Sequence, residues 1–348
     1  MSFHRVRLGV AAVMLLSVIL AACAAPSGGR KVCVVLDTGG ENDKSFNEFT
    51  LKGARNTARE LNLTFDHIVT ATDDDYGPYI NNFIDEECNL ILTVGFLMAQ
   101  ATADAARANP DVHFAIIDVF YGPGAFGCPQ DVESCYTEEG GLDNVTSLVF
   151  AEAEVGYLAG ILAGCMTQSD VIGSVAGMEI PPVVNFVTGY QNGARAVNPD
   201  VTTLNVYVPE FNDAYTGKQE GDRQIAAGAD VIFGVGGNAG NGGVLAARDV
   251  GLMAIGVDVD QYLTFPEVRP SLLTSAMKKV DVAAGDAVRA FAQNELEAGA
   301  RLSTVANGGV DLAPYHDWEE RIPQSCKDAV AAARASLASG DLDPMAAQ

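Results

Sequence analysis

Three aspartates and one lysine have the types and positions that proton transfer or ligand binding would need. Asp37, Asp118 and Asp258 each follow a short apolar run, and Lys278 lies just past another. Carboxylates in such positions can move protons or accept hydrogen bonds. The sequence contains no Gly-x-Ser-x-Gly elbow, no His-Glu-x-x-His pair and no Gly-x-x-x-x-Gly-Lys-Ser/Thr loop. With no nucleophile or metal ligand close in sequence, these residues favour ligand binding over catalysis.

The stretch that follows the first apolar run, residues 31–36, predicts the start of a ligand site. Ser45 and Glu48 have the spacing of a capping box, so Ser45 is expected to cap a helix that begins with Phe46 and Asn47. That helix would present an aromatic ring and an amide above the strand. Asp, Gly, Asn and Ser are also common in turns and helix caps that bind nothing. The alternative to a ligand site is therefore that these residues only form the turn and the cap.

A second aromatic ring, Phe211, lies in a polar turn after an apolar run that ends at Val208. An apolar ring has little core to enter at such a place. Phe211 and Phe46 could therefore clamp a flat ligand from two sides. The alternative is that both rings belong to the core, where most phenylalanines lie.

The glycine-rich segment 234–243 weakly matches the Gly-x-Gly-x-x-Ala pattern of dinucleotide sites, and Gly234 is a candidate ligand contact. Asp258 ends the next apolar run, about where a ribose-binding acid would be expected. Two observations argue against a bound dinucleotide. The segment lies late in the chain, and the amino terminus carries an export signal (described below), whereas nicotinamide cofactors are normally held inside the cell. We expect a helix over 244–250 after this segment.

Apolar runs that alternate with helical patterns along the chain predict a doubly wound α/β fold. Strands are expected at 31–36, 65–70, 90–94, 113–117, 171–175, 203–208, 231–233, 253–257 and 272–275. So many strands fit two sheets better than one, and the glycine-rich stretch 121–141 separates two comparable halves. Because ligands bind at the carboxyl ends of parallel strands, two lobes should face each other across a cleft that these ends line.

We expect the first lobe to comprise 31–145 plus about 262–302, and the second 146–261 plus about 303–348. The hinge would then lie near 144–150, with a return crossing near 259–263. Residues 1–22 would be a signal peptide and 23–30 a tether.

The amino-terminal segment has the features of a bacterial lipoprotein signal. Arg5 and Arg7 precede an uncharged run of 13 residues, 8–20, which is too short for an ordinary membrane span. The following Leu-Ala-Ala-Cys ends at Cys23 and resembles a lipobox, in which the cysteine carries lipid. This predicts a protein anchored by lipid at the extracytoplasmic face of the cell membrane. A plain secretory signal is the alternative.

The chain is strongly acidic, with a formal net charge of −24. Cleavage before Cys23 would remove two arginines and no acidic residue, giving −26. Such a surface disfavours nucleic acid and anionic lipid as partners, since both need clustered Lys and Arg. Solubility or a salty habitat could also account for this charge.

Six cysteines remain after Cys23, an even number for an exported protein. Cys128 and Cys135 flank a short loop and are expected to pair. Cys33 with Cys88 and Cys165 with Cys326 are two further candidate pairs, whose connectivity sequence alone does not fix. The cysteines and histidines form no cluster that indicates a metal site.

Six ordered segments resemble the basic membrane protein family, the substrate-binding lipoproteins of ABC transporters. They are DTGGENDKSFN (37–47), IID (116–118), EVGYLAG (154–160), ADVIF (229–233) with its glycine-rich loop, IGVDVDQ (255–261) and TSAMKKVD (274–281). The resemblance, which runs from Cys23 to about Pro344, implies a type I periplasmic-binding fold. It also implies a receptor rather than an enzyme, with no cofactor. The loop 121–141 looks longer than is usual in the family.

The best-understood members of this family are purine nucleoside receptors. The resemblance therefore implies a monomer that binds adenosine, guanosine or inosine and delivers it to a membrane permease. Ligand contacts are expected from Asp37, Phe46, Asn47, Asp118, Phe211, Asp258 and Lys278. Asn47 and Asp118 would read the base edge, while Asp258 and Lys278 would hold the ribose hydroxyls. Riboflavin or another flat heteroaromatic ligand is an alternative, and an exported nucleoside hydrolase is the rival from another class.

Overall fold

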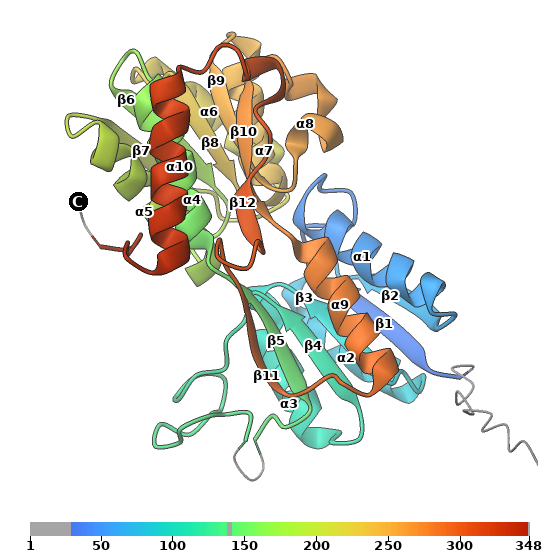
Figure 1. Ribbon diagram of the computed structural model, residues 1–348. Coiled ribbons are helices and arrows are strands. Elements are labelled where there is room, and N and C mark those ends of the chain that lie inside the picture. Colours follow the sequence, from blue (N-terminus) through green and yellow to red (C-terminus); the bar gives the residue numbers. More distant parts are fainter. Residues whose placement is uncertain (1–28, 138–140, 347–348) are drawn as a thin grey trace, which may run out of the picture.

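The computed structural model describes residues 29–137 and 141–346, and it shows two lobes joined by several crossing segments (Figure 1). Each lobe is built on one six-stranded sheet. The first has the strand order β11-β5-β4-β3-β1-β2 and the second β12-β10-β9-β8-β6-β7. The predicted signal peptide, 1–22, and residues 23–28 of the predicted tether 23–30, with Cys23, lie outside the described residues.

The first lobe takes most of its elements from the amino-terminal part of the chain. Its strands are β1 (Lys31–Leu36), β2 (Thr64–Val69), β3 (Leu90–Val94), β4 (His113–Ile117), β5 (Val145–Phe150) and β11 (Gly299–Ser303). Its helices are α1 (Phe46–Glu60), α2 (Tyr76–Asp85), α3 (Ala99–Ala108) and α9 (Val280–Gln293). Helices α1 and α9 lie side by side over the sheet (Figure 1).

The second lobe repeats this plan. Its strands are β6 (Val171–Ala176), β7 (Thr202–Tyr207), β8 (Val231–Val235), β9 (Met253–Asp258), β10 (Leu272–Lys278) and β12 (Val310–Leu312). Its helices are α4 (Glu152–Met166), α5 (Pro181–Val197), α6 (Ala214–Ala226), α7 (Gly237–Asp249), α8 (Gln261–Thr264) and α10 (Gln324–Ser339). Within the described residues, no helix combines the length and apolar character needed to cross a membrane.

The strand order explains why the ligand-site candidates converge. Strands β1 to β4 and β6 to β9 follow the same order in their sheets, and their pairings are parallel. Buried apolar side chains fill β1, β3, β8 and β9, as expected for parallel strands covered on both faces. Because parallel strands end at the same edge, the residues after β1, β4 and β9 gather at the carboxyl edges of the two sheets.

The sheets correct the expected lobe boundaries in two places. Strand β5 pairs with β4, so the first lobe continues to Phe150 rather than ending at 145. Strand β10 pairs with β9, so residues 272–278 belong to the second lobe rather than to the first. The chain therefore crosses between the sheets after β5, after β10 and after β11, and the expected return crossing at 259–263 is wrong.

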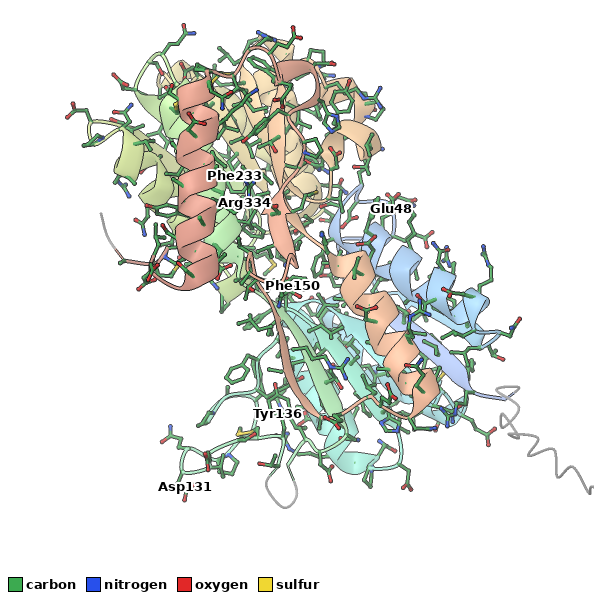
Figure 2. All side chains as sticks on the ribbon, viewed as in Figure 1. Glu48, Asp131, Tyr136, Phe150, Phe233 and Arg334 are labelled. Carbon is green, nitrogen blue, oxygen red and sulfur yellow. A yellow bond between two sulfur atoms is a disulfide. The ribbon has the colours of Figure 1, made fainter. Side chains whose placement is uncertain are left out.

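The long loop after β4 is an insertion within the first lobe and does not separate the halves of the chain, as the sequence had suggested. It runs from β4 to β5, and Figure 2 shows Asp131 out on this loop, away from the sheet. Cys128 and Cys135 form a disulfide within it. Disulfides also join the two other expected pairs, Cys33–Cys88 and Cys165–Cys326.

The glycines of the 154–160 segment have a packing role in the second lobe. Gly156 and Gly160 lie on α4 where it crosses α5, and a methyl group at either position would collide with a backbone carbonyl of α5. Helices approach this closely only where a side chain is missing. This segment therefore packs α4 against α5, and none of its residues lines the cavity described below.

Candidate functional site

A cavity lies between the two lobes, where the carboxyl edges of the sheets meet. The space between its lining atoms, including its mouth, is about 540 Å³. Of the expected ligand contacts, seven line it: Asp37, Phe46, Asn47, Asp118, Phe211, Asp258 and Lys278. The structure thus brings together side chains that are up to 241 residues apart in the sequence, from Asp37 to Lys278.

Asp118 and Asp258 occupy equivalent places in the two lobes. Asp118 follows β4 and Asp258 ends β9, each the fourth strand of its lobe. Both have left-handed backbone, with φ of 67° and 63°. This conformation is uncommon outside glycine and is tolerated best by Asp and Asn. The repeated strain is typical of binding sites, where the surrounding structure holds a side chain in one direction.

Lys278, at the end of β10, is the cation of the site and has only 2% of its side chain exposed. Its Nζ lies 2.5 Å from Asp118 Oδ2, across the cavity, and 3.5 Å from Glu152 Oε1. Burial lowers the pKa of Lys278, but Asp118, Glu152 and Asp258 outweigh it, so the pKa is raised overall and the ammonium stays charged. Asp258 acts on Lys278 through its charge, whereas Asp118 and Glu152 are in ion-pair contact with the ammonium.

Aromatic rings surround this ammonium. The Nζ of Lys278 lies 4.9 Å from the ring centre of Phe46, 5.1 Å from that of Phe150 and 5.7 Å from that of Phe186. Figure 2 shows Phe150 at the junction of the lobes, where β5 ends. Rings at these distances attract a cation and exclude water from it.

Glu152 is a site residue that the sequence reasoning missed. It is the first residue of α4, is 3% exposed, and accepts a long hydrogen bond of 3.5 Å from Asn185. Burial raises its pKa to about 8, although Lys278 opposes this shift. Two carboxyls, Glu152 and Glu154, begin an otherwise apolar helix, and this was the available signal.

Asp37 and Asn47 form a pair on the first-lobe wall. Asn47 Nδ2 donates to Asp37 Oδ1 at 2.7 Å, and the Gly39 N–H donates to the same oxygen at 2.9 Å. Burial raises the pKa of Asp37 to about 6, although both hydrogen bonds lower it. Two buried oxygens in this cavity, Asn47 Oδ1 and Asp118 Oδ1, have no hydrogen-bond partner in the structure. Such atoms are the ones that a ligand would be expected to satisfy.

The expected capping box at Ser45 and Glu48 is not formed. The helix does begin at Phe46, but the side chain of Ser45 makes no cap hydrogen bond. Instead, the buried Asp43 carboxylate accepts from the N–H groups of Ser45, Asn47 and Glu48 at 3.0, 2.9 and 3.2 Å. Burial raises the pKa of Asp43 to about 7 against these three bonds. Asp43 is therefore both the helix cap and a wall of the cavity.

The hydroxyl of Ser45, which makes no cap hydrogen bond, connects the first lobe to the second. It donates to Asp258 Oδ2 at 2.7 Å. Nearby, Asn241 Nδ2 donates to the Asp43 carbonyl at 3.0 Å, and Thr264 Oγ1 donates to the Lys44 carbonyl at 2.8 Å. These bonds run from the β1–α1 loop to the second lobe, so the lobes are closed over the cavity.

Phe46 and Phe211 line the cavity from different lobes, the first from α1 and the second from the turn between β7 and α6. Both rings are partly buried. Phe211 lies against Gly236, where an added methyl group would come within 3.1 Å of its ring. The glycines around this turn thus leave room for the ring at the edge of the cavity.

Gly234, a ligand contact expected from the sequence, does not line the cavity. It lies in β8, where a methyl group would come within 2.6 Å of Val244 on α7. Gly236 and Gly237, just after the strand, line the cavity instead. Helix α7 starts at Gly237, so much of the glycine-rich segment is helical and the expected helix at 244–250 begins earlier than predicted.

Comparison with known proteins agrees with this geometry. The family described as ABC transporter substrate-binding protein PnrA-like matches residues 30–324. The ABC transporter nucleoside-binding protein BmpA of Lactococcus lactis subsp. cremoris is 29% identical, over 96% of this chain and 97% of its own. An uncharacterized lipoprotein of Pyrococcus furiosus is 30% identical, over 80% of this chain and 69% of its own.

Among solved structures, a solute-binding protein of an ABC transporter system from Aeropyrum pernix K1 is similar, with a TM-score of 0.80 and 24% identity. The match covers 90% of this chain and 92% of that one. This likeness confirms the expected two-lobed, type I periplasmic-binding fold. The family match also confirms the resemblance found in the six sequence segments: the chain belongs to the PnrA-like family of ABC transporter substrate-binding proteins.

Proposed function

We propose that the cavity binds a purine nucleoside (adenosine, guanosine or inosine) and that the closed, monomeric receptor delivers it to a membrane permease. The observation that carries this proposal is one closed cavity in which Phe46 and Phe211 come from opposite lobes beside two unpartnered buried oxygens. An aromatic pair suits a flat ring system, and unpartnered acceptors suit its N–H groups.

The base edge is assigned to Asn47 and Asp118. Their free oxygens, Asn47 Oδ1 and Asp118 Oδ1, accept from ring N–H or exocyclic amino groups. A ligand that fills both positions regains the hydrogen bonds that burial removed from these atoms. A ligand without such donors leaves them unpaired and binds less well.

The ribose is assigned to Asp258 and Lys278, which end the neighbouring strands β9 and β10. A carboxylate accepts from a diol and an ammonium donates to it. A phosphate would bring negative charge beside Asp37, Asp118 and Asp258, with Lys278 as the cation that lines the cavity. Nucleotides should therefore bind far less well than nucleosides.

A calorimetric titration of a ligand panel tests this assignment. It compares adenosine, guanosine, inosine, uridine, adenosine monophosphate and riboflavin. Purine nucleosides are expected to bind tightest. Riboflavin alone would keep the aromatic clamp and overturn the ribose roles, a preference for the monophosphate would refute the charge argument, and steady release of free base, followed by chromatography, would indicate a hydrolase.

Truncation of either clamp residue should weaken nucleoside binding about 10- to 100-fold, because each base–ring stack contributes on the order of 1–3 kcal/mol. The variants are Phe46→Ala and Phe211→Ala, measured by calorimetry. Phe120→Ala is the control, since that ring is 58% exposed and does not line the cavity. Unchanged affinity in both clamp variants would return the two rings to a packing role.

Lipid attachment is assigned to Cys23, at the end of the Leu-Ala-Ala-Cys sequence. The name of the Pyrococcus furiosus relative as a lipoprotein supports this proposal. The Cys23→Ala variant should leave the membrane fraction when cells are fractionated. Retention of that variant at the membrane, to the same extent as the wild type, would argue against a lipid on Cys23.

A further inference from the structure

One wall of the cavity differs in character from the rest. The start of α5 supplies four lining residues, Ile180, Pro182, Val183 and Phe186, and all four are apolar. Val183 and Phe186 are buried and lie three residues apart, so they share one face of the helix. We call these four residues the α5 wall. The rest of the lining includes carboxylates, an amide and the ammonium of Lys278.

The backbone of the α5 wall is also poor in hydrogen-bond donors. A helix start usually offers free N–H groups, which hold hydroxyls and phosphates. Here the first two positions are Pro181 and Pro182, which have no N–H. The N–H of Val184 donates to the Ile180 carbonyl at 2.9 Å, so that of Val183 is the one first-turn donor left. The two prolines thus remove two of the donors that a helix start would otherwise offer to a polar ligand group.

The α5 wall begins beside the ammonium that is assigned to the sugar. Lys278 Nζ lies 5.7 Å from the ring centre of Phe186 and 4.9 Å from that of Phe46. With the base held between Phe46 and Phe211, and the ribose diol at Lys278, the group of a nucleoside that remains to be placed is its C5′ substituent. The α5 wall, through Phe186, is an apolar surface next to the sugar site, where this substituent would lie.

We propose that the site prefers purine nucleosides whose 5′ carbon carries an apolar group in place of the hydroxyl, namely 5′-deoxy or 5′-alkylthio nucleosides. This inference rests on the proposed nucleoside function. A 5′-hydroxyl against the α5 wall gives up its hydrogen bonds to water and gains no side-chain partner, whereas a methyl or alkylthio group removes apolar surface from water.

Matched pairs of ligands test the preference on the intact wild-type protein. Calorimetry compares adenosine with 5′-deoxyadenosine and 5′-methylthioadenosine, and inosine with 5′-deoxyinosine. The compounds without the 5′-hydroxyl should bind about tenfold tighter or better. Equal or tighter binding of the 5′-hydroxyl compounds overturns the inference and leaves the nucleoside function standing. Absence of binding by every purine nucleoside overturns the function itself, and the inference with it.

A substitution in the α5 wall gives a second test. Val183→Thr keeps the shape of the side chain and adds a hydroxyl to the wall, so it should reduce the preference for the 5′-deoxy compound about tenfold. Val184→Thr is the control on the same helix, because Val184 does not line the cavity. An unchanged preference in a folded Val183→Thr protein contradicts the role of the wall. If that variant fails to fold, the wild-type ligand pairs still decide the question.

Discussion

Replacement of Lys278 by Met should lower the free energy of unfolding by about 3–5 kcal/mol at pH 8, the usual cost of leaving a buried charge without its partner. Lys278 is the cation in contact with Asp118, at 2.5 Å, and with Glu152, at 3.5 Å, and all three side chains are under 10% exposed. Methionine fills a similar volume but leaves both carboxyls in a cavity without a positive charge. Urea denaturation measures the difference.

The loss caused by Lys278→Met should shrink as the pH falls. Without the ammonium, burial still raises the pKa of Asp118 and Glu152 in the folded protein, and the nearby Asp118 charge adds to the increase at Glu152. A carboxyl whose pKa is raised by folding takes up a proton when the protein folds. Its cost to the free energy of unfolding is therefore absent below the unfolded pKa and grows as the pH rises towards the folded pKa. The variant should therefore come closest to the wild type below about pH 4, under the ordinary pKa values of the two carboxyls, 3.8 and 4.5.

Two further variants separate charge from packing. Lys279→Met changes the adjacent, exposed lysine and should alter stability by no more than about 0.5 kcal/mol. Asp118→Asn combined with Lys278→Met removes both charges of the close pair and should recover much of the loss. A deficit in Lys278→Met that does not depend on pH, and that the second substitution leaves unchanged, would mean that the aliphatic stem of Lys278 matters more than its charge.

Local sequence signals were sufficient for much of the fold. Continuous apolar runs predicted the central parallel strands, because strands buried on both faces need no polar alternation. The strands that were missed have weaker patterns: β11 alternates between half-buried and exposed residues, and β12 has only three residues. Strand β5 was interpreted as a hinge, since it directly precedes the crossing to α4.

The division into lobes could not be obtained in the same way. Which sheet a strand joins depends on its pairing partners, and β10 pairs with β9 although the helix that follows it, α9, packs on α1 of the other lobe. Nothing in the residues of β10 distinguishes the two sheets. The structure alone shows that the chain passes between the lobes three times.

The candidate site was predictable where it follows strands and was missed where it depends on contacts across the cavity. Asp37, Asp118 and Asp258 stand at strand ends, a position that sequence patterns reveal. Glu152 belongs to the site because it reaches Lys278, 126 residues away in the chain. Asp43 caps the helix in place of Ser45, the cap predicted from the sequence. Its carboxylate turns towards the helix start and accepts from the N–H of Asn47, four residues later.

The substitution Asp43→Asn should change the pH dependence of stability by roughly 4 kcal/mol between pH 4 and pH 8, at 1.36 kcal/mol for each unit of pKa shift. Burial raises the pKa of Asp43 from 3.8 to about 7, so folding takes up a proton between these values. Wild-type stability should therefore fall as the pH rises through this range. Asparagine keeps one acceptor oxygen for the helix start and cannot ionise. The free energy of unfolding of the variant should therefore fall less than that of the wild type over this pH range.

The comparison works because the two proteins are nearly equivalent at low pH. A protonated Asp43 and an asparagine are both neutral and each has one carbonyl oxygen for the N–H groups of Ser45 and Glu48. Above pH 7 the wild type carries a buried charge that the variant lacks. Asp37 and Glu152 titrate in both proteins, so the difference between the two curves isolates Asp43.

Asp74→Asn, at an exposed position, is the control for the removal of one acidic charge. Its curve should run parallel to that of the wild type. Parallel curves for Asp43→Asn as well would mean that Asp43 is ionised in the folded protein throughout. The three backbone N–H bonds would then outweigh its burial, and a fixed negative charge would stand at the cavity wall beside Phe46 and Asn47.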